Sequence, residues 1–142
     1  MIDRYKAIQA ILAKVTPEDL VLSTTGMISR EAFIIEDRPG TFYMLGSMGL
    51  LSSFGLGLAL RLPEKNVYIL EGDGSALMSL GTLPLIATES PGNLFHVILD
   101  NEAYESTGAQ PSITSTVDLD EIAKSSGYSH VAKAENLEAL DI

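Results

Sequence analysis

A length of 142 residues with 46 % hydrophobic content suits one core and leaves no room for a second domain, so we predict a single domain over residues 1–142. The net charge of −10, with only nine Lys and Arg, argues against nucleic acid or an anionic membrane as a partner. The absence of Cys excludes disulfides, thiolate nucleophiles and cysteine-ligated metals. The first residues do not show the apolar core of a signal peptide, so we expect a cytoplasmic protein.

Helix and strand signals alternate along the chain. The expected helices cover residues 3–15, a short segment entered through Ser29, 48–61, 76–89, a segment from Asp118 to Gly127 and a last one over 136–140. The expected strands cover residues 20–23, 42–45, 67–71, 94–99 and 129–132. This alternation implies right-handed crossovers and a mainly parallel sheet with helices on both faces. We therefore predict a three-layer, doubly wound α/β fold.

Residues 41–60 carry no charged side chain and are long enough for a membrane span. The same stretch is rich in Gly and Ser, which equally suits a helix that packs closely inside a protein core. Because the segment after residue 66 is another strand signal, we favour the buried helix and expect no membrane association.

Two polar residues, Asp73 and Asn101, each stand just past an apolar run, at 67–71 and 94–99. If both runs are strands of one parallel sheet, a carboxylate and an amide oxygen emerge together at its carboxyl edge, where open α/β sheets bind ligands. Magnesium prefers oxygen ligands and is usually completed by water and substrate phosphates. The pair therefore predicts a cation site that carries a diphosphate.

A dinucleotide-binding loop is the competing interpretation, because a G-x-G pattern begins at Gly72 after a strand. The third glycine of that pattern is missing, since position 77 is Leu. In addition, the Asp73 carboxylate would repel a phosphate by roughly 4 kcal/mol at about 4 Å and an effective dielectric near 20. A cation between them reverses the sign of that interaction.

The segment Gly72-Asp73-Gly74 followed by Asn101 resembles the cofactor motif of thiamine diphosphate-dependent enzymes. The resemblance implies that the Asp73 and Asn101 side chains and the Ala103 carbonyl bind Mg²⁺. It also implies that Ser75 and the amides at the start of its helix face the diphosphate.

A second motif of this family is present in Gly46-Ser47-Met48-Gly49. By resemblance, this segment holds the aminopyrimidine of the cofactor, with the Gly46 carbonyl accepting a hydrogen bond from its amine. Met48 would be a wedge between the two rings that bends the cofactor into its reactive shape. Methionine suits this role because it is unbranched and polarizable, although a Met in an apolar stretch is more often plain core.

Residues 101–117 show no periodicity, and a loop of this length in a compact domain is usually functional. Two segments are similar to phosphonopyruvate and sulfopyruvate decarboxylases within the thiamine family; they are Ser106-Thr107-Gly108-Ala109-Gln110-Pro111 and Thr24-Thr25-Gly26-Met27-Ile28-Ser29-Arg30-Glu31. The resemblance implies that Thr25 and Gly26 approach the cofactor. Tyr104 follows the expected metal ligands and is predicted to approach the cofactor or the substrate, with a solvated loop residue as the alternative. The resemblance also places Ser106, Thr107 and Gln110 in a substrate loop. Two residues depart from the family pattern: Glu102 stands where Gly is common, and Ala109 stands where Gly or Asn is usual.

The resemblance implies a decarboxylase subunit that converts 3-sulfopyruvate to sulfoacetaldehyde and carbon dioxide. The alternatives are phosphonopyruvate decarboxylation, another thiamine-dependent carboligation, or a domain that binds the cofactor without turnover. The resemblance implies that the family's activating glutamate lies on a separate, pyrimidine-binding alpha subunit. The expected assembly is a homodimer of this chain or a larger hetero-oligomer. The chain is expected to be truncated before the family's last strand, and His96 is interpreted as an ordinary strand residue.

Overall fold

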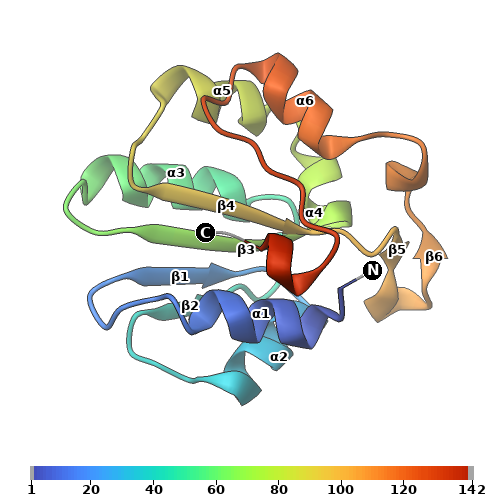
Figure 1. Cartoon of the computed structure of the whole chain (residues 1–142), viewed down its shortest axis with the longest axis horizontal. Helices are drawn as coiled ribbons and strands as arrows, with labels where there is room; N and C mark the ends of the chain where they lie inside the picture. The colour runs from blue at the N-terminus through green and yellow to red at the C-terminus, as the bar shows by residue number, and fades with distance from the viewer. Residues whose placement is uncertain (1, 141–142) are drawn as a thin grey trace.

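The computed structural model describes residues 2–140, and its centre is one parallel sheet of four strands (Figure 1). The strand order is β2-β1-β3-β4. In chain order the strands are β1 (Leu20–Ser23), β2 (Thr41–Tyr43), β3 (Val67–Gly72) and β4 (Leu94–Leu99). All three pairings are parallel, so the carboxyl ends of these strands share one edge of the sheet.

Helices pack on both faces of the sheet, which confirms the predicted doubly wound α/β class. The helices are α1 (Arg4–Leu12), α2 (Met27–Ile35), α3 (Leu51–Arg61), α4 (Asp73–Met78), α5 (Thr82–Glu89) and α6 (Leu119–Ser126). α1 and α2 cover one face, and α3 covers the other. Short 3-10 turns lie at Glu105–Thr107, Ile113–Ser115 and Leu137–Ala139.

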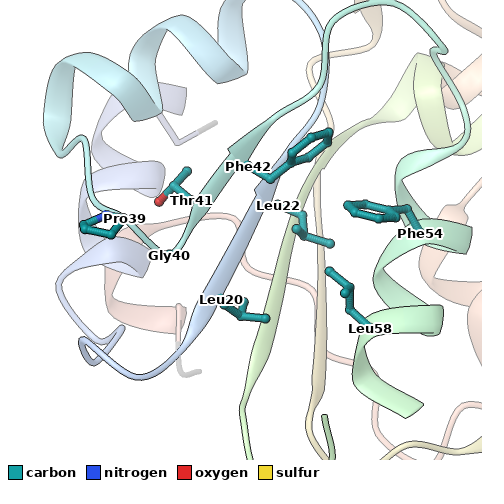
Figure 2. Close-up of a pocket in the computed structure, with 8 residues that line it drawn as sticks. All are labelled: Leu20, Leu22, Pro39, Gly40, Thr41, Phe42, Phe54 and Leu58. Atoms are coloured by element: carbon teal, nitrogen blue, oxygen red, sulfur yellow. The ribbon is translucent and has the colours of Figure 1, made fainter. Parts of the chain in front are cut away.

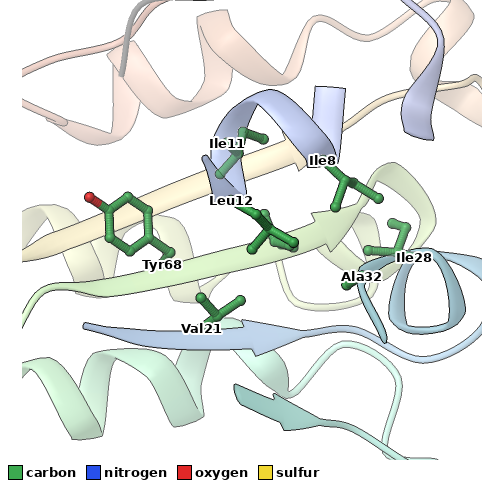
Figure 3. Close-up of a cluster of buried hydrophobic side chains, with 8 residues drawn as sticks. Ile8, Ile11, Leu12, Val21, Ile28, Ala32 and Tyr68 are labelled. Atoms are coloured by element: carbon green, nitrogen blue, oxygen red, sulfur yellow. The ribbon is translucent and has the colours of Figure 1, made fainter. Parts of the chain in front are cut away.

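The alternation of side chains along β3 divides the core into two halves. Tyr68 and Leu70 point to the face that α1 and α2 cover, whereas Val67 and Ile69 point to α3. Figure 3 shows the first half, in which side chains of α1 and α2 meet those of β1 and β3; its members are Ile8, Ile11, Leu12, Val21, Ile28, Ala32, Tyr68 and Leu70. Burying each large side chain contributes about 1.5–3 kcal/mol.

The uncharged segment is divided among β2, an exposed turn and α3, and only one side of α3 is buried. α3 lies so close to the sheet that a methyl group added at Gly55 would lie 2.4 Å from Cδ1 of Ile69. The small residue is thus what permits the close approach. No helix within residues 2–140 is long and apolar enough to cross a membrane.

The structure corrects several expected helix boundaries. The helix expected at 76–89 is two helices, because the chain turns at residues 79–81, where Ser79 leaves the helical region with φ −134°. The helix expected at 48–61 begins at Leu51, since Gly49 takes a positive φ of 92°. α2 follows Gly26 directly, and the Ser29 hydroxyl, which was expected to open it, donates to the Thr24 carbonyl.

The C-terminal part of the chain differs more from expectation. Gly127 ends α6 in the left-handed conformation, as predicted, but the Asp118 side chain makes no capping bond and lies 3.4 Å from Nζ of Lys133. The strand expected at 129–132 does not form, because Ser129 and His130 are exposed and this segment joins neither described sheet. The helix expected at 136–140 is a single 3-10 turn.

Candidate functional site

The carboxyl ends of β3 and β4 bring the predicted cation ligands to the same level of the sheet. Gly72 lies opposite Leu99 in the β3–β4 register, so Asp73 and Asp100 leave neighbouring strands side by side. Asp73 is the first residue of α4 and its relative exposure is only 2 %. Figure 1 shows α4 and the small hairpin of β5 (Ala103–Tyr104) and β6 (Gln110–Pro111) beyond the arrowheads of these strands.

The Asp73 carboxylate is oriented by two hydroxyl groups that the sequence analysis did not identify. The Ser112 hydroxyl donates to its Oδ2 atom, and the Thr114 hydroxyl lies 3.2 Å from the same oxygen. The Thr114 hydroxyl also lies 2.8 Å from Oδ1 of Asp100. Ser and Thr in a loop carry no signal by themselves, since their proximity to Asp73 depends on how the chain returns after β6.

The Asn101 side chain has a defined orientation. Its Oδ1 accepts from the Ala103 amide at 3.2 Å, and its Nδ2 donates to Oε2 of Glu105 at 3.5 Å. Glu105 is paired in turn with Arg4, whose guanidinium lowers the pKa of the Glu105 carboxyl. Arg4 also donates two hydrogen bonds, of 2.8 and 2.7 Å, to the two oxygens of Glu31 on α2. The start of the loop is therefore fastened to both α1 and α2.

The predicted pyrimidine-binding segment is an exposed turn with unusual backbone angles. Gly46, Ser47 and Gly49 have φ values of 74°, 52° and 92°. The end of the turn is anchored, because the Gly49 amide donates to the Ser75 hydroxyl at 3.1 Å. A methyl group added at Gly49 would lie 2.8 Å from Cβ of Met78, so this position has no room for a side chain.

Met48, Gly74 and Tyr104 meet at the start of α4, next to Asp73. A methyl group added at Gly74 would lie 2.4 Å from Cε1 of Tyr104 and 3.2 Å from Cε of Met48. The bare Cα of Gly74 is therefore needed for the approach of the Tyr104 ring. Gly72 is less crowded, since a methyl group there would lie 3.4 Å from Cδ1 of Ile28. Two of the motifs found in the sequence, and the loop that follows Asn101, thus come together around the start of α4.

The Ser75 hydroxyl points into the protein and not toward an open cofactor space. It donates to Oε1 of Glu71 at 2.7 Å, so only its backbone amide remains for a diphosphate. Glu71 has 0 % relative exposure, and its other carboxylate oxygen lies 2.7 Å from Nε2 of His96. The second ring nitrogen of His96 lies 3.2 Å from the Tyr128 hydroxyl. His96 is therefore a hydrogen-bonded strand residue, as interpreted, and burial together with the Glu71 charge raises the pKa of Tyr128.

The predicted substrate loop is the hairpin formed by residues 102–112. At its exposed tip, the Thr107 hydroxyl donates to Oε1 of Gln110 at 2.9 Å, and Nε2 of Gln110 donates back to the Thr107 carbonyl at 3.0 Å. Ser106 lies against Gly26, because a methyl group added at Gly26 would be 3.6 Å from Cβ of Ser106. Thr25 is half-buried in the same strand-to-helix loop, so the two segments that resemble the decarboxylases are neighbours.

Both departures from the family pattern lie at left-handed positions of the backbone. Glu102 has φ 56° and Ala109 has φ 57°. A non-glycine residue in this conformation costs roughly 1–2 kcal/mol, which explains why Gly, or Asn, is the usual residue there. The Glu102 amide donates to Oδ1 of Asp100 at 3.0 Å, and this bond helps to hold the strained turn.

We expect the Glu102→Gly variant to be more stable than Glu102→Ala by about 1 kcal/mol, because glycine removes the left-handed strain while alanine retains it. Urea unfolding followed by far-ultraviolet circular dichroism measures the difference. Ala109→Gly should behave in the same direction relative to the natural chain. Equal stability of the glycine and alanine variants at position 102 would show that the turn stores no strain.

Two of the hollows in the described part of the chain bear on where the site lies. Figure 2 shows the smaller one, about 170 Å³, where side chains of β1 and β2 face Phe54 and Leu58 of α3; it contains no predicted site residue. The larger one, about 1180 Å³, runs along β4 and reaches Asp100, Asn101 and Thr114 at one end. The carboxyl-edge geometry, not the small apolar hollow, therefore locates the candidate site.

The donor groups at this edge suit a magnesium diphosphate. A buried carboxylate, an amide oxygen and a backbone carbonyl come from Asp73, Asn101 and Ala103, and all three are hard oxygen ligands. No group of three or more His, Cys, Asp or Glu side chains suitable for an all-side-chain metal cage occurs among residues 2–140. A cation held here would keep open positions for phosphate oxygens.

Comparison with known proteins agrees with this geometry. Residues 24–141 match the family described as thiamine pyrophosphate enzyme, C-terminal TPP binding domain. The chain is 47 % identical over 137 residues to the sulfopyruvate decarboxylase subunit beta of Methanothermobacter thermautotrophicus, covering 96 % of this chain and 73 % of that protein. It is 45 % identical over 137 residues to the phosphonopyruvate decarboxylase of Streptomyces hygroscopicus, covering 96 % of this chain but only 34 % of that protein.

A solved structure shows the same fold at much lower sequence identity. The benzoylformate decarboxylase of Polynucleobacter necessarius aligns over 99 % of this chain and 31 % of its own, with a TM-score of 0.80 and 19 % identity. The family match spans most of the chain, and it includes the Gly46–Gly49 turn, the start of α4 and the hairpin. The chain therefore belongs to the thiamine pyrophosphate enzymes, as their C-terminal, cofactor-binding domain.

Proposed function

We propose that the chain is the diphosphate- and metal-binding part of a thiamine diphosphate-dependent decarboxylase that converts 3-sulfopyruvate to sulfoacetaldehyde and carbon dioxide. The observation that carries this proposal is the contact between the cation site and the hairpin that bears Ser106, Thr107 and Gln110. Asp73 at the start of α4 and Ser112 at the end of that hairpin share a hydrogen bond. The names of the sulfopyruvate decarboxylase relatives support the substrate.

In this proposal the chain's own residues bind and orient the cofactor. Asp73, Asn101 and the Ala103 carbonyl hold Mg²⁺, and the backbone amides of Gly74 and Ser75 bind diphosphate oxygens. When bound, thiamine diphosphate supplies the nucleophilic carbon and the electron sink for the carboxylate carbon–carbon bond. Every other contribution of this chain is positioning.

The Gly46–Gly49 turn is proposed to bind the aminopyrimidine, with Gly46 and Ser47 at the ring and Met48 as the wedge. The Gly49–Ser75 hydrogen bond supports this role because it anchors the turn to the helix that begins at Asp73. The hairpin tip meets the Thr25–Gly26 loop, because Ser106 lies against Gly26, and both segments are proposed to exclude water and to contact the acid group of the substrate.

The activating glutamate is proposed to come from a pyrimidine-binding alpha subunit. Large apolar side chains are exposed on and around the turn; they are Phe42, Leu45, Met48, Leu50, Phe54 and Met78. Leu45 is 94 % exposed, which is costly for a side chain that has no partner surface. A homodimer of this chain, or a larger hetero-oligomer in the cytoplasm, completes the proposal.

Phosphonopyruvate is the second candidate substrate, because relatives with that name match at nearly the same identity, 42–45 % against 42–47 % for the sulfopyruvate enzymes. The two acids differ in the group on carbon 3, which a sulfonate or a phosphonate occupies. Another thiamine-dependent carboligation, or cofactor binding without turnover, would keep the cation site and lose the substrate preference of the hairpin.

The proposal is tested by isolating the chain together with the proteins that co-purify with it from its native host. The complex, supplied with Mg²⁺ and thiamine diphosphate, is assayed for carbon dioxide release from 3-sulfopyruvate and from phosphonopyruvate. We expect turnover by the complex with a preference for 3-sulfopyruvate, and none by the chain alone. Saturable cofactor binding without release from either acid would favour the non-catalytic alternative, and full activity of the chain alone would refute the need for a partner.

We expect Met48→Ala to lower turnover by about 10–100-fold while cofactor affinity changes little, since a small misplacement of reacting groups is costly to rate and the cation carries most of the binding. Steady-state kinetics and a thiamine diphosphate titration of the complex measure the two effects. Met44→Ala is a buried methionine control on the same segment, outside the proposed site. Equal losses of turnover and affinity in Met48→Ala would mean that Met48 is only a packing residue.

A further inference from the structure

The hairpin is fastened at both ends to the two carboxylates that follow β3 and β4. At its base, the Ser112 amide donates to the Glu102 carbonyl at 2.9 Å. The first strand of the hairpin is tied to Asp100 through the Glu102 amide at 3.0 Å. The second strand is tied to Asp73 by the Ser112 hydroxyl, and the Thr114 hydroxyl lies within reach of both Asp73 and Asp100, so that its single proton can be donated to either carboxylate.

The two hydroxyl groups are well placed to orient a carboxylate. Ser112 and Thr114 are both buried, and their hydroxyls lie 2.7 Å from each other. Both reach the same oxygen of Asp73, Oδ2, so the carboxylate plane has a preferred rotation. Hydrogen bonds from neutral groups keep the full charge on the carboxylate, and this is the usual way in which proteins orient an anionic metal ligand.

We propose that Ser112 and Thr114 are positioning residues for the divalent cation, holding Oδ2 of Asp73 so that Oδ1 faces the cation, and that cation binding is thereby coupled to the order of the hairpin. The inference rests on the proposed function, because it assumes that Asp73 is a cation ligand. It adds two residues, and a link between the cation and the substrate-side hairpin, that no motif in the sequence indicates.

The coupling follows from the shared contacts. The cation needs Asp73 in one orientation, and that orientation needs the hairpin base in place to present the Ser112 and Thr114 hydroxyls. Linkage is reciprocal, so a cation that is bound more tightly when the hairpin is ordered must order the hairpin to the same extent. Removing either hydroxyl should therefore weaken cation binding and also reduce the extent to which the bound cation orders the hairpin.

The test uses Mn²⁺ as the cation probe, in the presence of thiamine diphosphate, with the full chain both alone and in the complex that co-purifies with it. Free Mn²⁺ is followed by electron paramagnetic resonance, and order in residues 102–112 by amide hydrogen exchange with and without the ion. The variants are Ser112→Ala and Thr114→Val. Thr116→Val is the matched control, because the Thr116 hydroxyl is in the same turn but donates to the Ile113 carbonyl. Ser112→Thr retains a hydroxyl at position 112.

We expect Ser112→Ala and Thr114→Val to bind Mn²⁺ about 10–100-fold more weakly, the range typical for loss of a group that orients a metal ligand. In these variants the ion should also protect the hairpin less from exchange, whereas Thr116→Val and Ser112→Thr should resemble the natural chain. Unchanged Mn²⁺ affinity in both alanine and valine variants would overturn the inference while leaving the proposed function standing. Failure of the natural chain and its complex to bind Mn²⁺ with thiamine diphosphate would overturn both.

Discussion

Replacing Asp73 by alanine is expected to abolish Mg²⁺-dependent binding of thiamine diphosphate, because this residue provides the only carboxylate of the proposed ligand set. An amide oxygen and a backbone carbonyl alone bind Mg²⁺ poorly, since the ion dehydrates reluctantly and needs a strong anionic ligand to do so. Isothermal titration of thiamine diphosphate in Mg²⁺, compared with the same titration in a chelator, measures the effect.

The fold should survive this change. After the loss of Asp73 the Ser112 and Thr114 hydroxyls can still bond to each other, and Thr114 can still donate to Asp100, so we expect a loss of no more than about 1–3 kcal/mol in unfolding free energy. Asp100→Asn is the matched control at the neighbouring strand end; it should retain most of the affinity, because its amide keeps an Oδ1 acceptor for the Glu102 amide and the Thr114 hydroxyl. Undiminished cofactor affinity in a folded Asp73→Ala protein would refute the cation site.

Replacing His96 by leucine should destabilise the domain by about 3–5 kcal/mol, since it leaves the carboxylate of Glu71 in the core with Ser75 as its remaining side-chain partner. Against a total stability of about 5–15 kcal/mol, that loss is large. The side chains of the pair are 0 % and 4 % exposed, for Glu71 and His96 respectively, so water cannot compensate for the missing partner. Urea unfolding measures the loss.

The double variant Glu71→Leu with His96→Leu distinguishes a buried pair from ordinary packing. It should recover part of the loss, because no uncompensated carboxylate remains and two contacting residues are not additive. His130→Leu is the control, since this histidine is exposed and its replacement should change stability by less than about 0.5 kcal/mol. A His96→Leu protein as stable as His130→Leu would show that the pair contributes little.

The elements that sequence reasoning located best are those with short, bounded apolar runs. The strand at 94–99 matches β4, and the strand at 67–71 is one residue shorter than β3. From these two strands alone, the placement of Asp73 and Asn101 at one sheet edge follows, because parallel strands end together. The helix boundaries were less predictable, since the turn at 79–81 interrupts a pattern that remains apolar on both sides.

The contacts that complete the site depend on chain paths that no local pattern describes. Ser112 is 39 residues from Asp73 along the chain, and His96 is 25 residues from Glu71. Glu71 stands in an apolar run, where a carboxylate is unexpected. Its partner is revealed only by the strand register: Ile98 of β4 lies opposite Glu71, and His96, two residues earlier on β4, is therefore its diagonal neighbour. An acidic residue inside a buried strand was a signal that a polar partner had to exist.

The construction of the hairpin has a consequence for altering the proposed substrate preference. Its stem is joined by backbone pairing between Ala103 and Pro111 and between Tyr104 and Gln110, while residues 105–110 are all exposed. Because the tip lies outside both halves of the core, we expect that it can be exchanged for the tip of a homologue, provided that Glu105 is kept for its pair with Arg4. Libraries that randomise residues 106–110 and keep Glu105 would test other acids as substrates of the proposed enzyme while the core, and hence the stability of each variant, stays similar.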